Sequence, residues 1–261
     1  MGLIRWPKRI DSCLNGGRMS LVRSIDRAAR RLGIADQLKY VRSRTSRVRR
    51  RDYLDTIHMR MLFAFVLREN ANCIDIGAHT GAILREMERC APQGRHYAFE
   101  PIPEFYERLL LDFPGVTISR AAVSSTSGTA TFKYVRTAPG YSGLLSRTYP
   151  RGAKTEDILV PVVSLDDFLP PDYAPDLIKI DVEGAEHLVL AGAERLIRAC
   201  RPIVVFEHGF GGQAPPGDVY AFFARAKFRI FDLDGHGPYD KATFLREYHV
   251  HKRHWNWVAH P

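Results

Sequence analysis

Hydrophobic and polar positions alternate between two periods from residue 53 onward. Apolar side chains recur at helical spacing over residues 53–67, and residues 72–77 then form a β-branched run that ends in glycine. We expect a helix followed by a buried strand that enters a tight turn. Further helices are predicted at 81–90, 103–112, 185–198 and 219–227, and strands at 95–100, 116–123, 158–164, 176–181, 202–207 and 228–233. This alternation predicts an α/β domain with right-handed parallel crossovers and helices on both faces of one sheet.

Two segments depart from the alternation. Residues 128–135 are predicted to form a short antiparallel element, and the polar, glycine-rich loop after them is a candidate substrate lid. Near the end of the sequence, Trp255 and Trp257 are two positions apart on an expected strand, so both side chains would cover the core from the same face.

Acidic residues stand where the predicted strands end. Asp75, Glu100, Asp181 and Glu207 each lie at the carboxyl end of a strand. Because parallel strands present their functional groups at that edge, we expect these four carboxylates to gather there.

Charge divides the chain into two parts. Residues 1–52 hold 15 Arg and Lys against 4 Asp and Glu, whereas residues 53–261 hold 23 against 25. We predict a basic, partly helical extension over 1–52 and a catalytic domain over 53–261. The extension includes apolar residues at helical spacing over 21–32 with arginines between them, which is typical of a helix that lies on an anionic membrane or packs on the domain.

Neither secretion nor membrane insertion is indicated. The N-terminus lacks an apolar signal region, and no apolar run reaches the roughly 18 residues of a membrane span. The four cysteines show neither C-x-x-C nor Cys/His metal spacing. We therefore expect a cytoplasmic protein, with peripheral contact at the inner face of the membrane as an option for the extension.

The first glycine loop favours a ligand without phosphates. Gly77 and Gly81 are four residues apart, which is not the G-x-G-x-x-G spacing of dinucleotide sites. Glu100 ends the second strand of the domain and can accept both hydroxyl protons of a ribose. S-adenosylmethionine combines that diol with a sulfonium cation suited to an acidic strand edge.

The sequence resembles the FkbM family of S-adenosylmethionine-dependent methyltransferases over about residues 72–208. The motifs that carry the resemblance are Ile74-Asp-Ile-Gly-Ala-His-Thr-Gly81, Phe99-Glu-Pro101, Ala121-Ala-Val-Ser124, Val163-Ser-Leu-Asp-Asp-Phe168, Lys179-Ile-Asp-Val-Glu-Gly-Ala-Glu186 and Arg201-Pro-Ile-Val-Val-Phe-Glu207. The resemblance implies a class I methyltransferase sandwich, Rossmann-like, with a mostly parallel sheet of seven strands.

The resemblance also implies a set of cofactor-binding residues. They are Asp75, Gly77, His79 and Gly81 in the first loop, Glu100 and Pro101 after the second strand, and Ala122 beside the adenine. His79 is a departure, because the family commonly has asparagine there.

For the chemistry we predict three catalytic carboxylates. Asp181 or Glu183 is the candidate base, and Glu207 is expected to help hold the acceptor. Two alternatives stay open: one carboxylate caps the next helix while the other contacts the cofactor amine, or all three hold Mg²⁺, although we assign no metal ligands. His208, which follows Glu207, is a further candidate base.

The leading hypothesis is an O-methyltransferase that acts on a hydroxyl of a carbohydrate, glycolipid or secondary metabolite, a substrate class implied by the resemblance alone. The arginine-rich extension suggests nucleic-acid methylation as an alternative, but residues 181–184 read Asp-Val-Glu-Gly and not as a base-flipping motif. A catalytically inactive membrane or adaptor protein is the third hypothesis, and the intact loop residues argue against it. The sequence makes no prediction of oligomeric state.

Overall fold

The computed structural model describes residues 35–208, 215–251 and 253–261. These residues belong to two compact units, Met1–Ile57 with Tyr149–Ala153, and His58–Thr148 with Lys154–Pro261. The predicted helix at 21–32 lies outside the described residues. Every helix in the part that is described is too short or too polar to span a lipid bilayer.

The first unit contains α2 (Ala35–Ser43) and the beginning of α3 (Arg47–Val66). We expected a helix over 53–67, and α3 instead begins six residues earlier. Arginine is a good helix former, so the basic run continues the helix, and an Arg51–Asp55 ion pair one turn apart supports it. The predicted boundary between residues 52 and 53 therefore falls inside a helix, and the separate domain at 1–52 stays a prediction.

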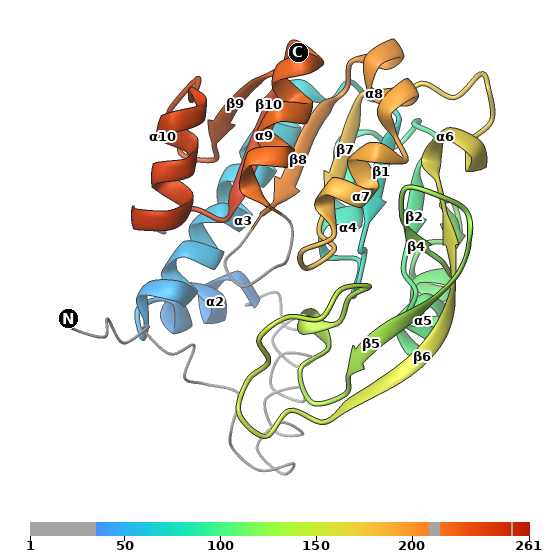
Figure 1. The fold of residues 1–261 in the computed structure, drawn as a ribbon, viewed down its shortest axis with the longest axis horizontal. Coiled ribbons are helices and arrows are strands. Elements are labelled where there is room, and N and C mark those ends of the chain that lie inside the picture. The colour runs from blue at the N-terminus through green and yellow to red at the C-terminus, as the bar shows by residue number, and fades with distance from the viewer. Residues whose placement is uncertain (1–34, 209–214, 252) are drawn as a thin grey trace. The chain divides into compact units, whose positions relative to one another are not determined.

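The second unit is built on a seven-stranded sheet of order β3-β2-β1-β7-β8-β10-β9 (Figure 1). Six of its strands run in one direction, and β10 runs antiparallel to them between β8 and β9. Their bounds are β1 Cys73–Ile76, β2 Tyr97–Phe99, β3 Thr117–Ser119, β7 Leu177–Ile180, β8 Ile203–Glu207, β9 Arg229–Asp232 and β10 Asn256–His260. The predicted class of fold, a mostly parallel sheet of seven strands, is confirmed.

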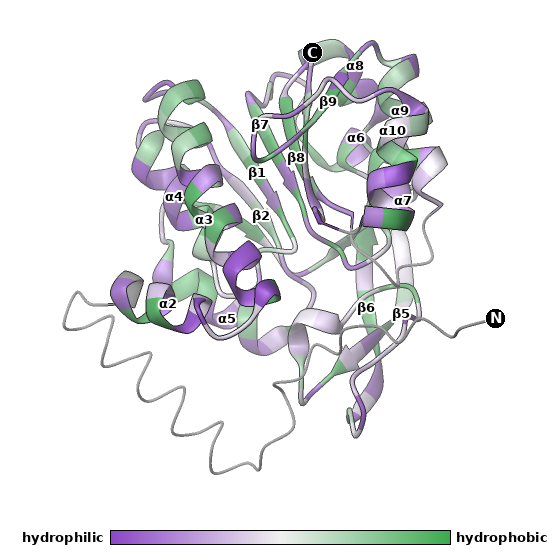
Figure 2. Ribbon diagram, turned by 90° about the vertical axis from the view of Figure 1, so that its left-hand side faces the viewer, coloured by the Kyte–Doolittle hydropathy of each residue, from purple (hydrophilic) through white to green (hydrophobic). Residues whose placement is uncertain are grey.

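Helices cover both faces of this sheet (Figure 2). On one face, α4 (Ala82–Cys90) and α5 (Pro103–Asp112) pack with the second half of α3 around a core that includes Phe63, Leu84 and Phe113. On the other face the helices are α7 (Glu186–Ala191), α8 (Glu194–Cys200), α9 (Pro216–Arg225) and α10 (Lys241–Arg246). Two short elements complete the unit, α6 (Leu165–Phe168) and the π-helical turn η2 (Glu247–His251).

A second sheet of three strands lies beside the first. It has the order β4-β6-β5, with β4 Ala122–Val123, β5 Gly128–Val135 and β6 Thr155–Val163. The single strand predicted at 116–123 is wrong, because β3 pairs with β2 whereas β4 leaves the main sheet and pairs with β6. The physical reason is a separate apolar cluster in which Ala122 packs with Phe132 and Val160.

The helix predicted at 185–198 is broken into α7 and α8. The break lies at Gly192, where a Cβ atom would come within 2.0 Å of the carbonyl oxygen of Ser124. The Asp166 carboxylate accepts the backbone N–H groups of Arg195 and Leu196 and so begins α8 anew. Periodicity alone does not reveal such an approach.

The expected aromatic strand is also placed differently. Trp257 lies in β10 and is fully buried, as predicted for a core side chain. Trp255 precedes β10, which begins at Asn256, and its carbonyl oxygen accepts the N–H of His208 just after β8.

Candidate active site

The turn after β1 packs directly against the end of β7. Gly77 has φ 81°, and its N–H and that of Ala78 donate to the carbonyl of Phe99 at the end of β2. A Cβ atom on Gly77 would lie 2.0 Å from the carbonyl oxygen of Asp181. Both the left-handed backbone and the close approach require glycine here.

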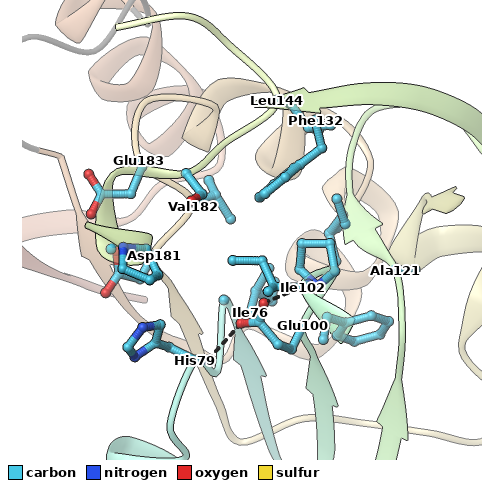
Figure 3. A pocket seen from close by; sticks show the side chains of 18 residues that line it. Ile76, His79, Glu100, Ile102, Ala121, Phe132, Leu144, Asp181, Val182 and Glu183 are labelled. Atoms are coloured by element: carbon cyan, nitrogen blue, oxygen red, sulfur yellow. Dashed lines mark hydrogen bonds between the residues drawn. The ribbon is translucent and has the colours of Figure 1, made fainter. Parts of the chain in front are cut away.

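A cavity of about 200 Å³ opens at this strand edge. Its wall combines the turn after β1, the end of β2, the crossing segment 121–123, the loop 139–144 and the turn 181–183. In Figure 3, Asp181 and Glu183 lie at the left of the cavity, Phe132 and Leu144 at the upper right, and Glu100 below the centre. One flank is therefore charged and the other apolar, as an amphiphilic ligand requires.

Glu100 is the most firmly held polar group in this wall. Its carboxylate accepts the N–H of His79 at 2.7 Å and the N–H of Ile102 at 2.9 Å (Figure 3). Burial raises the pKa of Glu100 to about 7, although the two N–H bonds act in the opposite direction. Each oxygen keeps a second lone pair, so the carboxylate can still accept two hydroxyl protons.

His79 occupies the left-handed region with φ 49°. This backbone is several-fold more common for Asn and His than for most residues, so histidine can replace asparagine without changing the turn. The imidazole packs against the Phe105 ring in a tilted arrangement, with centroids 4.1 Å apart and an interplanar angle of 43°. Burial lowers the pKa of His79, which favours a neutral ring in the cavity wall.

Five of the predicted cofactor-binding residues line the cavity: Gly77, His79, Glu100, Pro101 and Ala122. The other two, Asp75 and Gly81, do not. Burial raises the pKa of Asp75 to about 7 despite the nearby charge of Lys179, and a Cβ on Gly81 would meet the Phe113 ring at 2.3 Å. Asp75 is thus buried outside the cavity wall, and Gly81 is required by packing.

The three predicted catalytic carboxylates come together. One oxygen each of Asp181, Glu183 and Glu207 lies within 4.8 Å of the others. Two of these groups face cations: Lys179 Nζ is 3.3 Å from Asp181, and Arg147 forms an ion pair with Glu183.

The alternative that Asp181 or Glu183 caps the following helix finds no support in the hydrogen bonds. The N-cap Ala185 has no side-chain cap, and the backbone N–H of Gly184 donates at 2.8 Å to Glu186, the first residue of α7. Glu186 Oε2 in turn lies 3.1 Å from Nδ1 of His208. Both side chains are buried.

Sequence reasoning gave no role to Lys179, Arg147 or Glu186. The sequence does contain a signal for Lys179, because it is a lysine inside the apolar strand Leu177–Ile180. A buried charge is costly unless it is paired, so a nearby carboxylate partner could have been predicted. Glu186 stands within the quoted motif, at the start of a helix. Arg147 lies in an irregular loop, and nothing in the sequence pairs it with Glu183.

Residues 75–230 match the family described as the Methyltransferase FkbM domain, and that range includes every residue of the cavity wall. The chain belongs to the FkbM methyltransferase family. The glycine turn, Glu100 and the acidic turn after β7 all lie inside the matched range.

Among individual relatives, the chain is 32% identical to "Methyltransferase sdnD" of Sordaria araneosa over 161 residues. This match covers 49% of the chain and 62% of that protein. Solved structures with a similar arrangement include a methyltransferase FkbM from Methylobacillus flagellatus KT, with 19% identity and TM-score 0.46 over 75% of this chain and 45% of that one. Fibrillarin from Aeropyrum pernix has 12% identity and TM-score 0.44 over 78% and 74%.

Proposed function

We propose that this protein is an S-adenosylmethionine-dependent O-methyltransferase that acts on a hydroxyl of a carbohydrate, glycolipid or secondary metabolite. The observation that carries the proposal is Glu100, a buried carboxylate fixed by two backbone N–H groups in the wall of the cavity. The family match supports methyl transfer, and the neutral or acidic character of the wall supports a cationic cofactor without phosphates.

The residues fit this cofactor. Bound S-adenosylmethionine would supply an electrophilic methyl group on a sulfonium. Glu100 would bind the ribose hydroxyls, and Ile102 with Ala122 would provide apolar surface for the adenine. Asp75, with an Oδ2 that is buried and has no hydrogen-bond partner among the described residues, would contribute negative charge near the sulfonium side.

The acceptor side is formed by Asp181, Glu183 and Glu207. These groups can accept hydrogen bonds from several hydroxyls at once and thereby orient one of them toward the methyl group, which is a large part of the rate acceleration. A polyhydroxylated acceptor satisfies this arrangement. A phosphate backbone would be repelled by it, and this favours O-methylation of a small molecule over nucleic-acid methylation.

Calorimetric titration with S-adenosylmethionine and, separately, with NAD tests the cofactor. We expect micromolar binding of the first ligand and none of NAD. Glu100→Ala should weaken binding about 10- to 100-fold, because hydrogen bonds to a charged group contribute about 1.5–3 kcal/mol. Glu107→Ala, an exposed glutamate on α5, is the matched control and should bind like wild type. Binding of NAD alone, or of neither ligand, would refute the proposal.

We also propose that the three carboxylates bind the acceptor without Mg²⁺. The charge of Arg147 already compensates Glu183, and Lys179 compensates Asp181. With excess EDTA, we expect the affinity for S-adenosylmethionine to change by less than about twofold, which is under about 0.5 kcal/mol. Once an acceptor is known, the rate of methyl transfer should be equally insensitive to EDTA. A larger loss that Mg²⁺ restores would favour the metal.

A membrane contact of the basic extension is a separate proposal. On α2, Tyr40 and Val41 are 51% and 60% exposed beside Lys39 and Arg42, which is a combination typical of interfacial helices. We expect the full chain to sediment with vesicles that contain phosphatidylserine, and the double variant Tyr40→Ser, Val41→Ser to sediment less. Equal sedimentation of both proteins would remove α2 from the contact.

A further inference from the structure

The cavity is small for the ligands that it would have to hold. Its volume of about 200 Å³ is below the roughly 300–1,000 Å³ of small-molecule sites in proteins. Methyl transfer brings a cofactor and an acceptor together, so the space must widen when they enter. The contacts that hold each part of the wall indicate which part moves.

Most of the cavity wall is held by backbone contacts. The turn after β1 meets the acidic turn 181–183 at Gly77, where a Cβ atom would lie 2.0 Å from the carbonyl oxygen of Asp181. The end of β2 is fixed because Glu100 accepts two backbone N–H groups, and the segment 121–123 contains β4, which pairs with β6. The remaining part is the loop 139–144, which begins with the short 3₁₀ helix η1 (Pro139–Tyr141).

On one side, this loop is bonded to the strand that precedes it. Gly143 exchanges two backbone hydrogen bonds with Lys133 of β5, at 2.9 and 3.2 Å. The N–H of Val135, the last residue of β5, donates to Oγ of Ser142 at 2.9 Å. These bonds make the loop an extension of β5, so we expect the loop and the end of that strand to move as one piece.

On its other side, the loop meets the acidic turn. Arg147 forms an ion pair with Glu183, and its guanidinium lies over the Tyr141 ring, 5.1 Å from the centroid. The side chains of Arg147 and Glu183 are only 9% and 17% exposed. Gly143 rests on the same turn, because a Cβ atom there would lie 3.3 Å from the carbonyl oxygen of Val182. The seam between the loop and the turn is thus closed by an ion pair and by close packing.

We propose that residues 139–147 form a lid over the cavity and that Arg147 is its latch on the acidic turn. This inference rests on the proposed function. The lid opens along the seam, since an ion pair between side chains separates more readily than the backbone hydrogen bonds to β5. In Figure 3 the seam lies between Leu144 and Glu183, on the side of the cavity away from Glu100. Opening therefore admits ligands and leaves the ribose-binding carboxylate in place.

A latch has a kinetic signature that a ligand contact lacks. The lid closes over the empty cavity and over a bound ligand alike, so Arg147 raises the barriers to entry and to exit equally. Arg147→Met should accelerate both association and dissociation of tritiated S-adenosylmethionine about 10- to 100-fold, because a partly buried ion pair is lost. The dissociation constant should change less than about threefold. A changed dissociation constant with an unchanged association rate would show a ligand contact and no latch.

The first test needs no ligand. Ala122→Cys places a thiol in the cavity wall, and peptide mass spectrometry follows its reaction with fluorescein maleimide, a reagent larger than the cavity. Addition of Arg147→Met should speed this reaction about 10- to 100-fold, because the open lid becomes more populated. Arg136→Met is the matched control, since it removes an exposed ion pair with Glu156 in the same hairpin and should leave the rate unchanged. Equal rates with and without Arg147→Met would overturn the proposal.

The second test locks the lid with a disulfide. A Cβ atom on Gly143 would lie 3.8 Å from the Cβ atom of Glu183, a separation suited to a disulfide. In the double variant Gly143→Cys, Glu183→Cys, oxidation should nearly abolish exchange of tritiated S-adenosylmethionine, and dithiothreitol should restore it. Gly143→Cys alone is the control and should not respond to oxidation. Fast exchange in the cross-linked protein would refute the lid, and so would failure of the two thiols to join, because the loop would then not rest on the turn.

The labelling experiment separates the lid from the proposed function. If the protein does not bind S-adenosylmethionine but Arg147→Met still speeds labelling, the cofactor is wrong and the lid stands. If the protein binds S-adenosylmethionine but neither labelling nor exchange responds to Arg147→Met, the cofactor stands and the latch is refuted.

Discussion

The turns after β1 and β7 make an instructive comparison, because the two strands are paired neighbours and both turns hold a non-glycine residue in the left-handed region, His79 and Glu183. Before the first turn, burial is the largest influence on Asp75 in β1 and raises its pKa to about 7, although the charge of Lys179 acts in the opposite direction. The second turn carries carboxylates that face Lys179 and Arg147.

This difference separates two tasks. Carboxyl groups with raised pKa values gain most when a cation arrives, which suits the side that would receive a sulfonium. Carboxylates that already face cations offer hydrogen-bond acceptors with a charge that is compensated within the protein. The same strand edge thus holds two kinds of carboxyl group. Those near the first turn are buried with raised pKa values, and those after β7 form ion pairs with cations of the protein.

Gly77→Ala should have the largest effect on this arrangement. The new Cβ would lie 2.0 Å from the Asp181 carbonyl, at a backbone φ of 81°, and force the two turns apart. We expect a loss of about 4 kcal/mol in the free energy of unfolding, in the range of severe steric defects, together with loss of S-adenosylmethionine binding. Gly115→Ala is the control, since nothing lies within 4 Å of its Cβ position. Urea unfolding and calorimetry measure both, and a Gly77→Ala protein of normal stability would contradict the close approach.

Lys179→Met should be next. The lysine is 2% exposed, so its removal leaves Asp181 without compensation and Asp75 with still less reason to ionise. We expect a loss of about 3 kcal/mol, at the low end for buried pairs because a third of the Asp181 side chain is exposed. Lys133→Met breaks the more exposed pair with Asp157 and should cost under about 1 kcal/mol. If urea unfolding gave the same loss of free energy for both variants, the buried Lys179–Asp181 pair would be no more important for stability than the exposed pair.

The pH dependence of stability distinguishes the turns directly. A carboxyl group with a pKa that is higher in the folded state binds its proton more tightly there, so this contribution stabilises the ligand-free protein at low pH. It is lost as pH rises from about 4 to about 7. Relative to wild type, Asp75→Asn should therefore gain about 2 kcal/mol between pH 5 and pH 7. A constant difference in stability between wild type and Asp75→Asn across this pH range would refute the raised pKa.

Arg147→Met should have the smallest effect on the cofactor side. It removes the cation that faces Glu183 but touches neither the glycine turn nor Glu100. We expect the affinity for S-adenosylmethionine to change less than about threefold, well under 1 kcal/mol. Calorimetry measures this, with Arg108→Met on α5 as the exposed control. A change above tenfold would show that the two sides are not independent.

Much of this division could be predicted from the sequence. The strand ends at Asp75, Glu100, Asp181 and Glu207 follow from short apolar runs that stop at acidic residues, and their gathering at one edge follows from parallel topology. The match to the family and the mostly parallel main sheet of seven strands are as expected.

The features that the sequence did not predict have a common physical cause. The separation of β3 from β4, the break at Gly192 and the Arg147–Glu183 pair all depend on contacts between segments far apart in sequence. Local periodicity is blind to such contacts. The roles of Asp181, Glu183, Glu207 and the cofactor residues stay predictions until binding and transfer are measured.

The place of β10 has a consequence for how the protein is made. Among the described strands, β9 pairs with β10 alone, and β10 is synthesised after both of the strands that it joins. While the ribosome is still translating residues 256–260, β8 presents an open edge and β9 has no partner. Every residue of the cavity wall has been synthesised by then, so the ligand site can take shape on the nascent chain while the far edge of the sheet still exposes unpaired backbone to other chains.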